Sequence, residues 1–234
     1  MAKDEEIFPN APLIESVFEV RFPGNPALEC KRDALYAEFE ERFPIVKVPH
    51  NESGMLPAMP LYHFASADGN KAILSSIRSV GFSTKSYGGF SNFKKESLEI
   101  IKFAIAKFKI KKLIRTGLRY TNVIPFSREN HSIPVARFLN MKVVLPEVAP
   151  QTFENVALLM TSKVSDEGKL TTRIESGVVG AAESLVVDFD FFKEGDLNPS
   201  ELDDYIENSH KHTKQFFTAL VSDGYRKVMR GEVL

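Results

Sequence analysis

Alternation between apolar and polar side chains is strongest near the middle of the chain, in KLIRTGLRYTNVIPF at residues 112–126. Its apolar positions are Ile114, Leu118, Tyr120 and Ile124. Most positions between them are small or polar, and a period of two is typical of a β-strand with one buried face. The segment 12–22 alternates in the same way and is a second predicted strand. Its apolar face consists of Ile14, Phe18, Val20 and Phe22.

Shorter alternating or apolar runs, separated by turn residues, predict further strands. They cover residues 45–48, 61–66, 72–80, 81–87, 155–164, 169–178 and 184–192. Three longer segments carry apolar residues at the spacing of an amphipathic helix. They cover residues 28–43, 91–108 and 201–231. Ser91 or Asn92 is the expected cap of the second helix, and Gly224 is expected to bend the third, because glycine weakens a helix interior by about 1 kcal/mol. A short helical segment is expected at 134–140.

The predicted elements repeat in the same order in the two halves of the chain: strand, helix, three-strand meander, helix. An offset of 100 residues aligns Phe18 with Leu118 without a gap. This order favours an internal duplication of segments 12–108 and 112–231, although so short a match also arises by chance. We therefore expect an α+β protein, a single compact domain over residues 1–234, with a mainly antiparallel sheet and its helices on one face.

The composition, with 43% apolar and 26% charged residues, is that of a soluble globular protein. The formal net charge of −1 argues against a nucleic-acid-binding protein that relies on general attraction to phosphate, although a local basic patch stays open. Cys30 is the single cysteine, so no internal disulfide is expected. The start MAKDEEIF lacks the zones of a secretory signal, and no apolar run reaches the roughly 20 residues needed to cross a bilayer. These features predict a cytoplasmic protein.

Arg115 and Arg119 share the polar face of the central predicted strand, about 13 Å apart at about 3.3 Å per residue. Two guanidinium groups placed in this way can bind a phosphate or carboxylate through bidentate hydrogen bonds. The same offset of 100 residues also sets Glu15 against Arg115 and Glu19 against Arg119. An ion-pair ladder between neighbouring strands therefore accounts for the same residues, and both interpretations stay open.

Asp188 and Asp190 share one face of the predicted strand in SLVVDFDFF. Two carboxylates can hold a divalent metal ion or act as an acid–base pair, but a strand with one solvated face gives the same alternation. His210 and His212 lie two residues apart on a predicted helix and diverge by about 200°, so we expect them at the surface rather than in a joint metal site. The sequence contains no glycine-rich phosphate loop, no G-x-S-x-G, no H-E-x-x-H and no Cys/His zinc spacing, so no cofactor is expected.

The segments NAPLIESVFEVRFP, GLRYTNVIPF and HKHTKQFFTALVSDGYRKVM resemble three marks of a sporadically distributed bacterial family of conserved hypothetical proteins. Members of that family begin with N-A-P-L-x-E-x-x-F-E-x-R-F, carry a strand like G-L-R-Y-x-N near the middle and end on a helix rich in Phe. The resemblance spans nearly the whole chain and implies no activity, cofactor or catalytic residue. It marks Arg119 and Asn122 as polar members of a characteristic strand.

These observations favour a non-catalytic ligand-binding or regulatory protein. Its polar sheet face, covered by the predicted loop 44–60, would recognise an anionic small molecule or a partner protein through Arg115, Arg119 and Asn122. One alternative is a metal-dependent phosphoryl or phosphodiester enzyme that uses the aspartate pair in SLVVDFDFF. Another is a structural protein that forms a homodimer through an exposed sheet edge or through its last helix.

Overall fold

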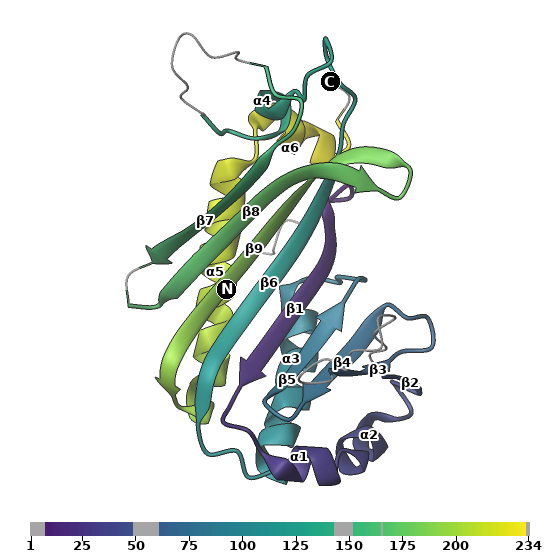
Figure 1. Ribbon diagram of the computed structural model, residues 1–234, viewed down its shortest axis with the longest axis vertical. Helices are drawn as coiled ribbons and strands as arrows, with labels where there is room; N and C mark the ends of the chain where they lie inside the picture. Colours follow the sequence, from purple (N-terminus) through teal and green to yellow (C-terminus); the bar gives the residue numbers. More distant parts are fainter. Residues whose placement is uncertain (1–7, 49–60, 143–151, 165, 233–234) are drawn as a thin grey trace.

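The computed structural model describes residues 8–48, 61–142, 152–164 and 166–232. These residues form one nine-stranded sheet in the order β2-β3-β4-β5-β1-β6-β9-β8-β7, in which every neighbouring pair is antiparallel (Figure 1). The strands are β1 (Leu13–Arg21), β2 (Ile45–Lys47), β3 (Tyr62–Ala65), β4 (Lys71–Ser76), β5 (Ser79–Thr84), β6 (Leu113–Pro125), β7 (Ala157–Val164), β8 (Gly168–Val179) and β9 (Ala182–Leu197). The predicted antiparallel sheet is confirmed. Of the expected covering loop 44–60, residues 49–60 lie outside the described residues.

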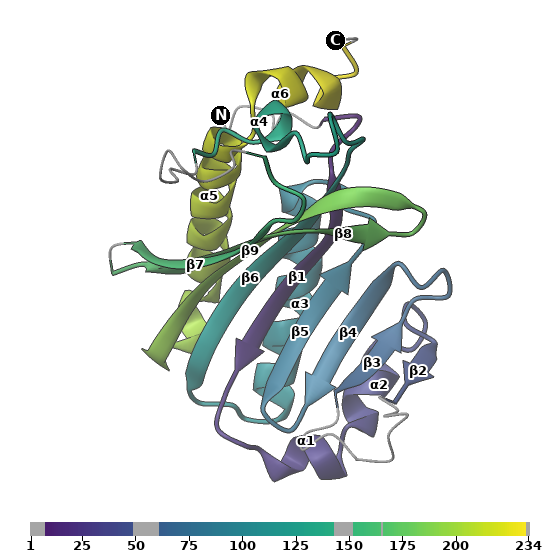
Figure 2. The ribbon, with the colours of Figure 1, turned by 45° about the horizontal axis from the view of Figure 1, so that its top comes forward.

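Two long helices, α3 (Phe90–Lys107) and α5 (Leu202–Leu220), lie on the same face of this sheet (Figures 1 and 2). The shorter helices are α1 (Pro26–Cys30), α2 (Asp33–Phe39), α4 (Val135–Phe138), α6 (Asp223–Met229) and the 3-10 turn η1 (Pro199–Glu201). The predicted α+β class is therefore confirmed. Within the described residues, no helix has the length and apolar character that crossing a membrane requires.

The sheet has an approximate two-fold arrangement about its central strand pair. β1 and β6 run antiparallel with Phe18 opposite Leu118, the two residues that an offset of 100 aligns. β5, β4 and β3 follow on the side of β1, and β9, β8 and β7 follow in the same way on the side of β6. The helices α3 and α5 also run antiparallel, since Phe90 stacks on His210 while Lys94 pairs with Glu207. Two duplicated halves would produce this arrangement, and their common origin stays a prediction.

The alternation along the two central strands is interrupted once in each. In β6 the pairing register shifts between Leu113 and Arg115, which turns Ile114 outward to 39% exposure while Leu113 is fully buried. In β1 the equivalent isoleucine, Ile14, is 44% exposed beside a similar shift. The predicted apolar faces are wrong at these two isoleucines, because an irregular pairing of this kind resets the alternation.

The hairpin between β4 and β5 turns earlier than the sequence predicts. Ser76 lies opposite Ser79, so the turn is at residues 77–78 and not beyond Val80. The hydroxyl groups of Ser76 and Ser79 are hydrogen-bonded at 2.9 Å, and the Ser76 Oγ also accepts the Arg78 N–H. The sequence does not indicate this tight turn, because apolar residues lie on both sides of it.

Helix boundaries differ from the prediction in the first half of the chain. The predicted helix 28–43 consists of α1 and α2, because Lys31 leaves the helical conformation with φ −132° and ψ 30°. The cap of α3 is Gly89, with φ 95°, so neither Ser91 nor Asn92 serves that role. A positive φ favours glycine, which explains why a residue without a capping side chain occupies this position.

The predicted helix 201–231 is broken rather than bent. Val221 is extended with ψ 132°, and α5 ends there. The Ser222 side chain then accepts a hydrogen bond from the Tyr225 N–H at 3.0 Å and caps α6. The break between α5 and α6 therefore lies at Val221 and Ser222 and follows from the serine cap. Gly224 lies inside α6.

Two clusters of buried side chains fill the space between the sheet and the helices. The first joins α3 to β1 and β5 and is rich in phenylalanine, as the composition predicts. It also includes Leu118 and Ile206 from the second half of the chain. The second cluster joins α4, α6 and the end of α5 to β8 and β9, around Phe189 and Phe191. The opposite face of the sheet is called here the uncovered face, because neither α3 nor α5 lies on it (Figure 2). It carries the charged residues singled out from the sequence.

Candidate functional site

The arginines and aspartates that the sequence placed in separate candidate sites form one cluster on the uncovered face. The Arg115 Nη2 lies 2.6 Å from the Asp190 Oδ2, and its Nη1 lies 3.7 Å from the Glu19 Oε1. The Arg119 Nε donates to both carboxylate oxygens of Asp188, at 2.8 and 3.0 Å. The main ion pairs therefore connect β6 to β9.

The predicted ladder from Glu15 to Arg115 and from Glu19 to Arg119 is wrong in its pairing. The antiparallel register sets Glu19 opposite Gly117 and sets Arg119 opposite Val17. Glu15 instead accepts a hydrogen bond from the Ser83 hydroxyl at 2.8 Å. Pairing residues at a fixed offset of 100 would require β1 and β6 to run parallel. The two strands are antiparallel, so residues related by this offset are not opposite one another except near the centre of the pair.

Arg119 is held in a way that leaves most of its hydrogen-bonding capacity unused. Its Nε binds Asp188, and among the described residues its two terminal amino groups have no hydrogen-bond partner. The Arg119 side chain is 50% exposed, whereas that of Asp188 is only 12% exposed. The hydrogen bond from Asp188 raises the pKa of Arg119 above its ordinary value. The guanidinium group is therefore charged, fixed in position and open on one side.

A cavity of about 430 Å³, called here the sheet-face cavity, lies beside these residues on the uncovered face. Its lining includes Glu15, Glu19, Lys47, His63, Lys85, Arg115, Gly117 and Arg119. Gly117 also lines it, and Gly117 and Gly81 lie on either side of Glu19 on the neighbouring strands. A Cβ atom at Gly117 would lie 2.5 Å from the Arg115 Nη1, and one at Gly81 would lie 2.8 Å from the Phe18 carbonyl oxygen. Larger residues at these positions would displace the arginine or the strand.

The lining of this cavity carries more positive than negative charge. Its lysines Lys47 and Lys85 have no ion-pair partner in the part of the chain that the structure describes, whereas Lys71 pairs with Glu96 at 2.7 Å. Burial, together with Lys47, lowers the pKa of His63 from its ordinary value, and Glu15 opposes this effect. The cavity therefore combines two unpaired ammonium groups with the exposed guanidinium of Arg119, which suits an anionic ligand.

Asn122 does not belong to this cavity. Its side chain is 4% exposed, lies on the helix-covered face and donates to the Val187 carbonyl oxygen at 3.2 Å. Successive residues of a strand point to opposite faces, so Asn122 cannot join Arg119 at an odd spacing of three. The sequence interpretation grouped the two by motif and overlooked this parity.

The metal site that the aspartate pair suggested has no support in the described part of the chain. No group of three or more potential ligands from His, Cys, Asp and Glu occurs there. Asp188 and Asp190 each have an arginine partner at hydrogen-bond distance. Burial raises the pKa of Asp190 from its ordinary value, while Arg115 opposes the rise. These carboxylates serve to hold the arginines.

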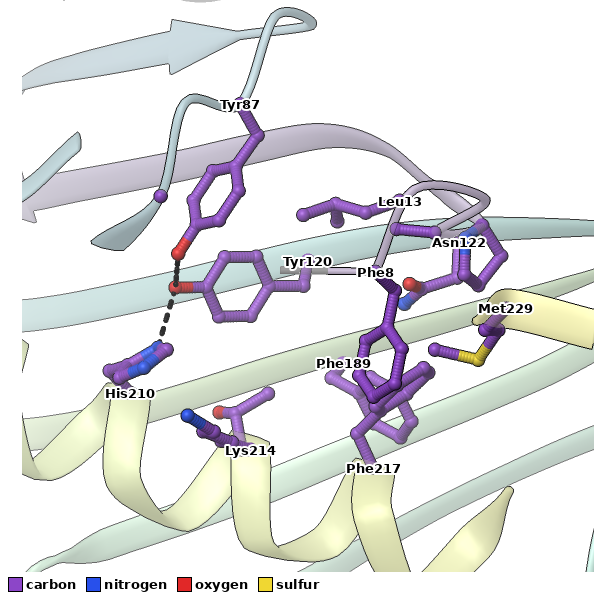
Figure 3. A pocket seen from close by; sticks show the side chains of 14 residues that line it. Phe8, Leu13, Tyr87, Tyr120, Asn122, Phe189, His210, Lys214, Phe217 and Met229 are labelled. Carbon is purple, nitrogen blue, oxygen red and sulfur yellow. Dashed lines mark hydrogen bonds between the residues drawn. The ribbon is translucent and has the colours of Figure 1, made fainter. Parts of the chain in front are cut away.

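A second pocket, called here the helix-side pocket, has a volume of about 220 Å³ and lies between the sheet and α5 (Figure 3). Its lining includes Leu13, Tyr87, Tyr120, Asn122, Phe189, His210, Lys214, Phe217 and Met229. The Tyr120 hydroxyl lies 3.0 Å from the His210 Nδ1 and 3.5 Å from the Tyr87 hydroxyl. The hydroxyl groups of Tyr87 and Tyr120 and the His210 ring therefore lie at one end of the pocket. Most side chains at the other end are apolar, with Asn122 among them (Figure 3).

His210 was expected at the surface, and the structure instead stacks its ring on Phe90 with centroids 3.8 Å apart. His212 diverges from it as predicted and stacks on Phe191. A signal for His210 was present in the sequence, because it lies between Ile206 and Thr213 on the inner stripe of the helix. Tyr120 was assigned to the core by its alternation, which took no account of its hydroxyl group.

Comparison with known proteins adds no name to these sites. A scan against protein-family models found no match, and a search of curated proteins found none either.

Proposed function

We propose that this protein is a non-catalytic binding protein that recognises a small anionic molecule in the sheet-face cavity. The observation that carries the proposal is the state of Arg119, which Asp188 holds through Nε, while within the described part of the chain neither terminal amino group has a hydrogen-bond partner. A guanidinium group fixed in this way binds a carboxylate or phosphate with two parallel hydrogen bonds and loses little side-chain freedom on binding.

The surrounding residues support an anion rather than a cation. Lys85 follows β5 and lines the same cavity as Arg119, and Lys47 lines it from the sheet edge. Four acids of this face each accept a hydrogen bond or ion pair from a neighbouring side chain. Glu15 accepts from the Ser83 hydroxyl, whereas Glu19, Asp188 and Asp190 each pair with an arginine. The last three position cations, and this role favours binding over acid–base chemistry. The cavity, of about 430 Å³, has the size of a site for a small molecule.

The proposal is tested by titrating the protein with inorganic pyrophosphate and with citrate in a calorimeter at low salt. Arg119→Lys keeps a charge beside Asp188 but removes the fork, and we expect binding about 10 to 100 times weaker, since a hydrogen bond to a charged group contributes about 1.5–3 kcal/mol. Lys85→Gln should also weaken binding. Because Lys85 has no ion-pair partner among the described residues, this substitution leaves no acid unpaired.

Arg173→Lys is the matched control, because Arg173 is paired with Glu175 at 2.6 Å on β8 and does not line the cavity. Its affinity for both anions should equal that of the wild type. The proposal fails if neither anion binds the wild type at millimolar concentration, or if Arg119→Lys and Lys85→Gln bind as tightly as the control.

One observation favours a second candidate function, the formation of a homodimer. β7 is the last strand in the order of the described sheet, and its Leu159 is 69% exposed and its Met160 41% exposed. A long apolar edge strand offers unpaired backbone groups to another strand. We propose pairing of two copies through β7 as the alternative role.

A further inference from the structure

The floor of the sheet-face cavity crosses the sheet along rows of residues that lie opposite one another. One row begins at Arg119 on β6 and continues through Val17 on β1 and Ser83 on β5. It then reaches Ala72 on β4 and Ala65 on β3. All five residues line the cavity, so the cavity extends across five neighbouring strands, which Figure 2 shows side by side.

The middle of this floor is mainly apolar. Val17, Ala72 and Leu74 line the cavity and are partly exposed. Ser83 is the polar residue among them, and its hydroxyl group already donates to Glu15 at 2.8 Å. A polar group that lost its water here would gain few hydrogen bonds in return. The stretch between β6 and β3 therefore suits an apolar chain.

A second cationic group lies at the far end of the cavity. Lys47 is on β2, the last strand on this side of the described sheet, and lies opposite His63. It has no ion-pair partner among the described residues, and it acts together with burial to lower the pKa of His63. Both side chains line the cavity, so the positive charge of Lys47 is close to its lining.

The two cationic ends are too far apart for one compact anion. The order β2-β3-β4-β5-β1-β6 places five strand spacings between Lys47 and Arg119. At about 4.8 Å per spacing, the two backbones are roughly 24 Å apart along the sheet, a span that the two long side chains only partly close. A small anion bound at Arg119 therefore leaves Lys47 without a partner.

We propose that the ligand of the sheet-face cavity is an elongated dianion, with one anionic group on Arg119, a second on Lys47 and an apolar chain between them. The chain lies over Val17, Ala72 and Leu74. This inference rests on the function proposed above and narrows its class of ligand. Arg119 supplies a planar fork and Lys47 a point charge. Two weak contacts joined in one molecule reinforce each other, because the second forms at a high effective concentration.

The test measures the binding of sebacate, decanoate and succinate to the full chain by calorimetry at low salt. Sebacate and decanoate have the same chain length and differ in the second carboxylate. Sebacate and succinate both have two carboxylates and differ in length. We expect sebacate to bind the wild type about five times more tightly than either of the others, the effect of one exposed ion pair, since Lys47 is exposed.

Lys47→Gln should lower the affinity for sebacate to that for decanoate and leave the affinity for pyrophosphate unchanged. Lys163→Gln is the matched control, because Lys163 is an exposed lysine on β7, the last strand on the other side of the described sheet, and does not line the cavity. The control should bind every probe as the wild type does.

The inference is overturned if sebacate binds the wild type no more tightly than decanoate and succinate do. It is also overturned if Lys47→Gln binds sebacate as tightly as Lys163→Gln does. Either result leaves the proposed function intact, provided that pyrophosphate binds the wild type and binds Arg119→Lys more weakly. If neither pyrophosphate nor sebacate binds the wild type at millimolar concentration, both proposals fail.

Discussion

At the scale of single residues, the uncovered face depends on carboxylates that are partly withdrawn from water. The side chain of Asp190 is 31% exposed and that of its partner Arg115 is 14% exposed. The Arg115 guanidinium carbon lies over the Phe192 ring, 4.8 Å from the ring centroid. Removing one member of such a pair leaves the other buried without compensation. Arg115 therefore has a structural role, in contrast to the half-exposed Arg119.

Arg115→Ala should lower the free energy of unfolding at neutral pH by about 2–4 kcal/mol, because it leaves Asp190 ionised without its cation. Burial already raises the pKa of Asp190 above 3.8, and loss of Arg115 should raise it further. A raised folded-state pKa gives a contribution to stability that is present below pH 3.8 and is lost as the pH rises through the folded value. The penalty of the substitution should therefore shrink in acid.

Urea denaturation of wild type and variant across the acid range measures this penalty. Arg173→Ala removes an exposed pair on the same face and should cost no more than about 0.5 kcal/mol at any pH. An Arg115→Ala penalty that is equally small, or that grows in acid, would contradict the role given to Asp190.

His63 reports on the charge of the sheet-face cavity. Its pKa is lowered by burial and by Lys47, and it is raised by Glu15. Lys47→Gln should raise this pKa, Glu15→Gln should lower it, and a bound anion should raise it. Because the folded pKa lies below 6.5, the contribution of His63 to stability is present above that pH and is lost as the pH falls through the folded value.

An NMR titration of the histidine ring protons gives the pKa of His63 in each variant. His131, which lies outside the lining of the cavity, serves as an internal reference in the same spectra. Equal pKa values of His63 in Lys47→Gln, Glu15→Gln and the wild type would show that these charges do not act on it.

At the scale of elements, alternation located the strands well because each has one face in the core. It failed at Ile14 and Ile114, where the register shift depends on the neighbouring strand, which local sequence does not specify. The break before α6 was also misplaced. A bend was predicted at Gly224 because glycine is a weak helix former, whereas the break follows from the extended Val221 and the cap at Ser222.

Ser222→Ala should lower the free energy of unfolding by about 1–2 kcal/mol, because the Ser222 hydroxyl accepts from the Tyr225 N–H and donates to the Arg137 carbonyl oxygen at 2.6 Å. Gly224→Ala should raise it by about 0.5–1 kcal/mol, since a Cβ there meets no atom closer than 3.9 Å and alanine favours a helix interior. Urea denaturation separates the two. If Gly224→Ala destabilised as strongly as Ser222→Ala, the assignment of the break to the serine would be wrong.

At the scale of the whole molecule, the order of the elements predicted a mainly antiparallel sheet with helices on one face, and the sheet has that arrangement (Figure 1). The duplication of two similar halves stays a prediction. The candidate site was predictable only in part. Arg115, Arg119, Asp188 and Asp190 were all identified, but their grouping depends on β6 lying beside β9, which joins residues about 70 positions apart. The helix-side pocket was not predicted, because the residues that line it have the sequence pattern of ordinary core positions.

The exposed edge of the molecule makes a separate prediction about assembly. Leu159→Lys places a charge on β7 at a side chain that is 69% exposed, so the free energy of unfolding should change by less than about 0.5 kcal/mol. If two copies pair through β7, light scattering should show a wild-type dimer and a Leu159→Lys monomer. Identical masses for the two proteins would exclude this edge as the contact.

The central pairing of β1 with β6 also governs how the chain reaches its native state. The cluster under α3 contains Leu118 and Ile206, so the core of the first half is complete only when the second half packs against it. Each meander can form early from local contacts, but joining them closes a loop of about 100 residues at Phe18 and Leu118. Folding is thus expected to be limited by this long-range closure. We therefore expect that neither half folds alone and that the whole sheet melts in one cooperative transition.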